Sequence, residues 1–254
     1  MKLNKLNKNV IPAINSGKIK PVAAIFKGID ATQEAFIVGN SSTLNKLTPQ
    51  QFKRINEGFT IGFASFALFQ PIKADILMLE LSDFWHTDTG LATLDAVKSR
   101  YLHDSKVLLK DLAKDEAQAA IDFANLTKTN DNIYFTPDVF FGGNEPAKVR
   151  AQYRQYFSQF ANSDKIEFLP RKRASITMAL CLLLLAGFKK IHFVACELAH
   201  SKYFNGYEGA GVHLTEDKRY GLPVSEVIRQ IIPAEVYSYG GRLARFGICK
   251  DLNL

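Results

Sequence analysis

Short apolar runs recur along the chain, and most of them are separated by longer segments that mix polar and apolar residues. Apolar runs of this length predict β-strands, whereas the longer mixed segments predict helices. The predicted strands are 35–39, 60–66, 75–81, 132–136, 165–169, 190–196 and 235–239. The predicted helices are 48–56, about 88–125, 146–161, 174–186 and 223–232. This alternation predicts an α/β fold with a Rossmann-like, mostly parallel sheet and helices on both of its faces.

Two helix boundaries carry local signals. Thr48 followed by Pro49 is typical of an N-cap before a first-turn proline, and Gly187 stands where the helix at 174–186 has to end. The end of that helix reads "MALCLLLLA" and is apolar nearly all round. A helix of this kind, followed directly by an apolar strand, is expected at the centre of a layered α/β domain.

The net charge of the chain favours an anionic partner. The 254 residues carry a formal net charge of +7, which suits nucleic acid, a membrane surface or a phosphorylated small molecule. Six lysines precede the first acidic residue, Asp30. We therefore expect a basic N-terminal arm over 1–30, or else a solvated terminus, followed by a single α/β domain over 31–254.

The apolar runs and the cysteines bear on the cellular compartment in which the protein is expected. No signal peptide is apparent, and the longest apolar run, 178–187, is about half of what a bilayer crossing needs. The three cysteines are widely spaced and form no CxxC motif, which predicts neither a disulfide framework nor a zinc site. We expect a cytoplasmic protein, with contact at the inner face of the membrane left open.

The turn after the first predicted strand reads Gly-Asn-Ser-Ser, residues 39–42. In parallel sheets, ligands bind beyond the carboxyl ends of the strands. Gly39 would let the backbone approach a ligand closely, and free amides with the Ser41 and Ser42 hydroxyls would suit a phosphate. The alternative is that Asn40 or Ser41 only caps the following turn.

Further candidates follow the later strands. A basic triplet, 171–173, precedes Ser175 at a predicted helix start, where it would face an anion or form a solvated cluster. Glu197 directly follows the strand at 190–196, inside which His192 is expected to be a core residue with its hydrogen bonds satisfied. A glycine-rich and aromatic-rich segment, 199–221, predicts a lid loop or an irregular surface excursion.

His213 in this segment is the best candidate for a general acid or base, because imidazole titrates near neutral pH. Trp85 and His86 form a second candidate feature of the same rim. The chain has no GxGxxG, GxxxxGK[ST], Asp-x-Asp, GxSxG or HExxH motif. Dinucleotide oxidoreductases, P-loop NTPases and zinc peptidases are therefore disfavoured, and we expect no metal or other cofactor.

Two blocks of sequence resemble the bacterial sialyltransferases of glycosyltransferase family 42. The first is "VGNSSTL", where the family has a strand running into a Gly-Asn-Gly-Pro-Ser-Leu turn. The second is "RASITMALCLLLLAGFKKIHFVACEL", where the family has Arg and Ser before an apolar helix, a Gly-aromatic-Lys turn and a strand that ends in an acidic residue. The resemblance extends loosely from about residue 35 to the end, and it implies a variant of the GT-A fold.

The resemblance implies a metal-independent transfer of sialic acid or a related ulosonic acid, such as Kdo, from a CMP-activated donor to a glycan hydroxyl. His213 matches the family's general base, while Tyr203 and Arg173 match residues that steady the departing phosphate. The implied donor site comprises the following residues: Gly39, Asn40, Ser41, Ser42, Ser65, Ser175 and Glu197. The implied partners are the CMP-sugar and a glycan or lipid-linked oligosaccharide acceptor of bacterial surface polysaccharide.

The chain also departs from the family pattern. It lacks the second glycine and the proline of the first turn, Arg173 is shifted by one residue, and Ser65 and the neighbourhood of Glu80 stand where the family has donor-binding asparagines. Two alternatives therefore stay open: another α/β enzyme that acts on a phosphorylated metabolite, or a non-catalytic module that binds polysaccharide or nucleic acid. The chain has no recognisable nucleic-acid-binding motif, so we expect no nucleic acid as partner, and a homo-oligomer is left open.

Overall fold

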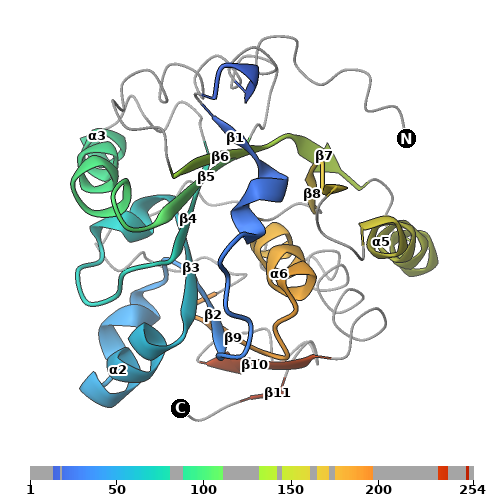
Figure 1. Ribbon diagram of the computed structural model, residues 1–254. Helices are drawn as coiled ribbons and strands as arrows, with labels where there is room; N and C mark the ends of the chain where they lie inside the picture. The colour runs from blue at the N-terminus through green and yellow to red at the C-terminus, as the bar shows by residue number, and fades with distance from the viewer. Residues whose placement is uncertain are drawn as a thin grey trace.

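Nine strands form one sheet in the computed structural model, which describes residues 14–17, 19–80, 88–110, 132–141, 145–160, 165–171, 175–196, 234–239 and 250–251 (Figure 1). Their spatial order is β1 (Lys20–Pro21), β6 (Ile133–Thr136), β5 (Lys106–Lys110), β4 (Ile76–Glu80), β3 (Phe59–Phe63), β2 (Ala35–Val38), β9 (Lys190–Val194), β10 (Glu235–Tyr239) and β11 (Lys250–Asp251). Every neighbouring pair is parallel. The predicted α/β, Rossmann-like parallel fold is confirmed.

Helices cover both faces of the sheet (Figure 1). On β2, Ala35 and Ile37 pack into one hydrophobic core, whereas Phe36 and Val38 pack into the other, because successive side chains of a strand point to opposite faces. The first core lies under α5 (Pro146–Phe160), α6 (Ser175–Ala186) and the 3-10 helix η1 (Val22–Phe26). The second lies under α2 (Pro49–Glu57) and the 3-10 helices η2 (Ser42–Lys46) and η3 (Ala64–Leu68). The π-helical turn η5 (Val97–Tyr101), which follows α3 (Asp88–Ala96), also packs against this core.

The two boundaries with local signals form as predicted. Thr48 caps α2, since its hydroxyl accepts from the Gln51 backbone N–H at 3.4 Å while the Gln51 side chain accepts from the Thr48 N–H at 2.6 Å. Gly187 ends α6 with a positive φ of 96°, a conformation that favours glycine. All residues from Ile176 to Leu184 are buried, so the expectation that this helix lies at the centre of the domain is confirmed.

The prediction of one long helix over about 88–125 is wrong. The helix α3 ends at Ala96, and residues 106–110 form β5 in the interior of the sheet, paired with β4 and β6. Leu108 packs into one core while Val107 and Leu109 pack into the other. A strand that is buried on both faces reads as a continuous apolar run, so its periodicity does not distinguish it from a buried helix.

Two other boundaries differ from the sequence-based ones. The predicted strand at 165–169 begins only at Leu169, and it forms a separate two-stranded parallel sheet from β8 (Leu169–Arg171) and β7 (Asp138–Phe140). The packed part of the chain begins before residue 31, because Ile19, Val22 and Ile25 of the expected basic arm are buried. The predicted helix at 223–232 lies outside the described residues.

Within the described ranges, no helix combines the length and the apolar character that a bilayer crossing requires.

Candidate functional site

The carboxyl ends of β2 and β9 lie side by side where the strand order reverses (Figure 1). From β2 the chain adds β3, β4, β5 and β6 in succession on one side, and it later places β9 on the other side. Val38 and Val194, the last residues of the two strands, are register partners. Ligands of open parallel sheets bind in the crevice at such a switch point. The turn that follows Val38 is the Gly-Asn-Ser-Ser turn singled out from the sequence.

Gly39 is required here by a close backbone approach. Its N–H donates to Val194 O at 2.8 Å, and the Ser41 N–H donates to Ala195 O at 3.4 Å. A Cβ on Gly39 would lie 2.3 Å from Ala195 O and 3.1 Å from the Cα of Cys196. The turn after β2 and the turn after β9 are therefore joined so tightly that only glycine fits between them.

Strained backbone flanks this turn on both sides. Among the described residues, two that are not glycine have positive φ: Ala64 at 40° directly after β3, and Ala195 at 51° directly after β9. Each such conformation costs an L-residue about 1–2 kcal/mol, and strain of this kind collects at functional sites. Both alanines stand at the carboxyl rim, on the two strands that neighbour β2.

Asn40 links the turn to the strained backbone after β3. Its side-chain Nδ2 donates to Phe63 O at 3.1 Å, which fixes the orientation of the amide because only the nitrogen can donate. Its Oδ1 is buried and accepts no hydrogen bond from the described residues. A buried amide oxygen without a donor is costly, so this atom is suited to accept from a ligand hydroxyl or amino group.

The serines near the turn have different roles. Ser41 is buried, and its Oγ accepts from the Thr43 N–H at 3.1 Å as the N-cap of η2, so the capping alternative holds for this residue. Ser42 begins η2 and is half-buried. Ser65 is buried in η3, one residue beyond Ala64.

A second polar cluster lies further along the same rim, at the ends of β4 and β5. Lys110 is only 1% exposed, and its Nζ donates to Glu80 Oε2 at 2.9 Å and to the Ser175 hydroxyl. Glu80 and Lys110 are the last residues of their strands and are register partners, while Ser175 begins α6. The Glu80 side chain is 40% exposed. The structure thus brings the predicted Ser175 together with a buried lysine that the sequence had placed in a helix.

The turn and this cluster are separate features of one rim. Two strand intervals separate β2 from β4 and three separate it from β5, which corresponds to about 10 and 14 Å. The sequence-based expectation was that the first turn and the 171–175 segment could converge on one anion. Convergence on one anion stays a prediction, whereas the two features share one rim that an elongated ligand such as a nucleotide sugar can follow.

Several predicted site residues lie outside the described residues: Arg173, Glu197, Tyr203, His213, Trp85 and His86, together with the lid segment 199–221. Of the basic triplet, the structure describes Arg171, the last residue of β8.

The predicted core position of His192 is confirmed. Its ring is buried and stacks between Phe36 and Tyr237, with ring centroids 4.9 and 5.2 Å apart. Burial lowers the pKa of His192 to about 4, although Glu34, 3.5 Å from Nε2, raises it in part. The sequence also predicted that the hydrogen bonds of this ring are satisfied, but Nε2 has no hydrogen-bond partner among the described residues.

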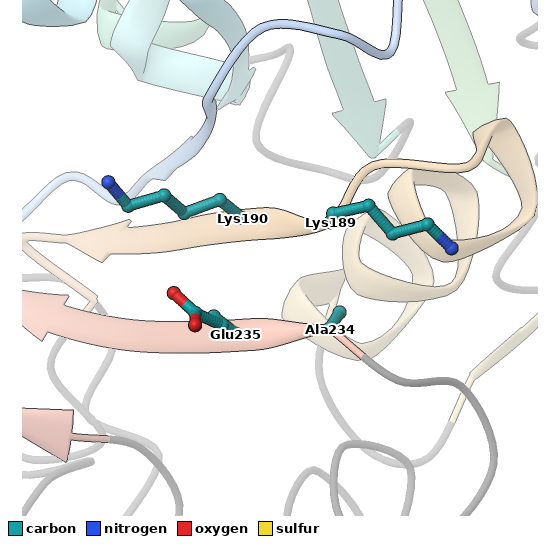
Figure 2. A pocket seen from close by; sticks show the side chains of 4 residues that line it. All are labelled: Lys189, Lys190, Ala234 and Glu235. Carbon is teal, nitrogen blue, oxygen red and sulfur yellow. The ribbon is translucent and has the colours of Figure 1, made fainter.

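A shallow pocket of about 450 Å³ lies at the opposite, amino-terminal edge of the sheet (Figure 2). Lys189, Lys190, Ala234 and Glu235 line it, at the starts of β9 and β10. Two of its three charged residues are engaged in local contacts, since Lys190 Nζ donates to Glu34 and the Tyr237 hydroxyl donates to Glu235 at 2.6 Å. Ligands of parallel α/β sheets bind at the other edge, so this pocket is not the candidate site.

Sequence reasoning missed Lys110 as a site residue. The available signal was a lysine at the end of the apolar run "KVLLK". Because this run was predicted to be helical, the sequence did not place Lys110 at the end of a strand on the carboxyl rim.

No known protein family and no curated protein sequence matches the chain.

Proposed function

We propose that the chain is a glycosyltransferase that moves sialic acid or a related ulosonic acid, such as Kdo, from a CMP-activated donor to a glycan hydroxyl of a bacterial surface polysaccharide. The observation that carries the proposal is the turn at the switch point, where Gly39 packs against the backbone after β9. Its resemblance to the first turn of the family 42 sialyltransferases gives the donor class.

In this proposal the crevice holds the nucleotide part of the donor. The buried Oδ1 of Asn40 accepts a hydrogen bond from a donor group of the nucleotide, while Nδ2 stays bound to Phe63 O. Ala64 and Ala195 keep their positive φ because the surrounding structure holds both flanking turns, and turns that are held before the ligand arrives lower the ordering cost of binding. The net charge of +7 favours an anionic donor.

The chemistry is a displacement at the anomeric carbon. The acceptor hydroxyl forms a bond to this carbon while the bond to the phosphate oxygen breaks, and CMP leaves. His213 takes the proton of the acceptor hydroxyl, while Tyr203 and Arg173 stabilise the negative charge on the departing phosphate. These three roles rest on the resemblance alone, because all three residues lie outside the described ranges.

A thermal-shift screen with CMP, UMP, AMP and NAD, without added magnesium, tests the nucleotide class. We expect selective stabilisation by CMP, because only a ligand that binds the folded state raises its melting temperature. Asn40→Ala should weaken CMP binding about tenfold, as expected when a buried hydrogen bond is lost. The matched control is Asn45→Ala, an exposed asparagine of the neighbouring η2. No shift with CMP at millimolar concentrations contradicts the proposal.

Turnover separates the proposal from its alternatives. His213→Ala should abolish transfer from CMP-N-acetylneuraminate or CMP-Kdo while CMP still binds. Stabilisation by another phosphorylated metabolite, with no response to CMP, would favour a different α/β enzyme. Binding of polysaccharide without donor turnover would favour a binding module.

A further inference from the structure

The ion pair at the ends of β4 and β5 joins a buried lysine to a half-exposed glutamate. Lys110 and Glu80 are register partners on two interior strands, and the lysine is 1% exposed. Burying the ammonium group of Lys110 costs desolvation free energy, so the stability of the fold alone is a weak explanation for a lysine at this position. The position is informative, because both residues stand at the carboxyl rim where ligands of such sheets bind.

The hydrogen bonds within this cluster determine which donor and acceptor groups it offers to a ligand. An ammonium group only donates, so the Ser175 oxygen accepts from Lys110 and the Ser175 O–H points elsewhere. Glu80 is a carboxylate that accepts from Lys110 through Oε2, and its side chain remains 40% exposed. The cluster therefore combines a hydroxyl donor and a carboxylate acceptor, both held by one buried cation.

The spacing of these two groups suits a hydroxyl of a ligand. Two oxygens that accept from one tetrahedral ammonium lie about 5 Å apart. A ligand hydroxyl about 2.7 Å from each of them donates to the carboxylate and accepts from the serine. A phosphate group fits less well, because it would place its negative charge beside Glu80.

We propose that Glu80 and Ser175 bind a sugar hydroxyl of a nucleotide-sugar donor, with Lys110 as the positioning residue that holds both. This inference rests on the proposed function for its ligand class, and it assigns the sugar part of the donor to the carboxyl ends of β4 and β5, which lie about 10 and 14 Å from β2. Lys110 acts through its two partners, whereas Glu80 and Ser175 touch the ligand.

The test measures how much more tightly the protein binds a nucleotide sugar than the parent nucleotide without the sugar. Dissociation constants are measured by calorimetry for three pairs of nucleotide sugar and parent nucleotide: CMP-N-acetylneuraminate with CMP, UDP-glucose with UDP, and GDP-mannose with GDP. In the pair that binds, Glu80→Gln should weaken the nucleotide sugar about tenfold and leave the parent nucleotide unchanged. Ser175→Ala should act in the same direction, about fivefold.

Two further variants guard against a purely structural explanation. Lys110→Met should reduce the affinity that the sugar adds over the parent nucleotide. Combining it with Glu80→Gln should lower that added affinity little further, because both changes disrupt the same cluster of Lys110, Glu80 and Ser175. If Lys110→Met does not fold, the Glu80 and Ser175 variants carry the test. The matched control is Asp104→Asn, which removes the 2.8 Å ion pair to Lys73 at the amino ends of the same two strands. It should leave every dissociation constant unchanged.

The outcomes separate this inference from the proposed function. If a UDP or GDP pair binds with a sugar increment that depends on Glu80, the CMP assignment fails and the subsite stands. If the CMP pair binds and Glu80→Gln preserves its increment, or weakens CMP equally, the subsite is overturned and the CMP assignment stands. If no pair binds, or no sugar adds affinity, the subsite is overturned.

Discussion

Replacing Gly39 by alanine tests the close packing on which the candidate crevice depends. The new Cβ would lie 2.3 Å from Ala195 O and 3.1 Å from the Cα of Cys196. Ordinary contacts of a Cβ begin near 3.4 Å, so the two turns would have to separate by about 1 Å. Both obstructing atoms belong to the backbone, and no side-chain rotation relieves the overlap.

The expected cost follows from two effects. Overpacking of this kind costs about 1–3 kcal/mol, and separation of the turns weakens the bonds from Gly39 N to Val194 O and from Ser41 N to Ala195 O, at about 1 kcal/mol each. The lower chain entropy of alanine in the unfolded state offsets about 0.5 kcal/mol. We expect a loss of roughly 2.5–4.5 kcal/mol in the free energy of unfolding, which for this length lowers the melting temperature by roughly 5–18 °C.

Urea and thermal denaturation of the wild type and the variant measure this loss, and CMP titration of the folded variant shows whether the crevice still binds. Gly28→Ala is the control, because Gly28 has a φ of 75° and open space around its would-be Cβ. That variant carries only conformational strain, about 1–2 kcal/mol, and should keep CMP binding. A Gly39→Ala protein within about 2 °C of the wild type, with CMP affinity intact, would refute the reasoning.

Three further predictions concern the scaffold. His192 has a pKa near 4 in the folded protein against 6.5 ordinarily, so its neutral form contributes about 3 kcal/mol that is complete above pH 6.5 and is lost as the pH falls toward 4. In urea titrations at pH 7.5 and 4.5, the free energy of unfolding of His192→Phe should lack this part of the pH dependence. The same difference between the two pH values in the wild type and the variant would contradict the lowered pKa of His192. Thr48→Ala should lower the free energy of unfolding by about 1 kcal/mol through loss of the capping box, whereas Pro49→Ala at the next position should preserve the cap. Tyr156→Phe should cost about 1–2 kcal/mol in the same assay, because it leaves the buried carbonyl of Phe168 without its 2.6 Å donor; a neutral result would show that another donor replaces it.

The sequence by itself determined the features that depend on near neighbours. The Thr48 cap and the Gly187 stop follow from backbone geometry within one helical turn, and both form as predicted. The surface of α6 is apolar nearly all round and required burial whatever its surroundings, so its central position was also predictable. The alternation of strands and helices was sufficient for the fold class, because parallel strands need crossover connections.

Only the tertiary structure decided which distant segments meet. The sequence did not show that β9 lies beside β2, and this placement alone makes Gly39 a close-contact position and the following turn a switch point. The strand β5 was mistaken for helix because its burial on both faces comes from neighbours remote in the chain. The meeting of Lys110 with Glu80 and Ser175 has the same origin: these residues are separated by 30 and 65 positions, and strand register and helix packing, rather than local propensity, bring their side chains together.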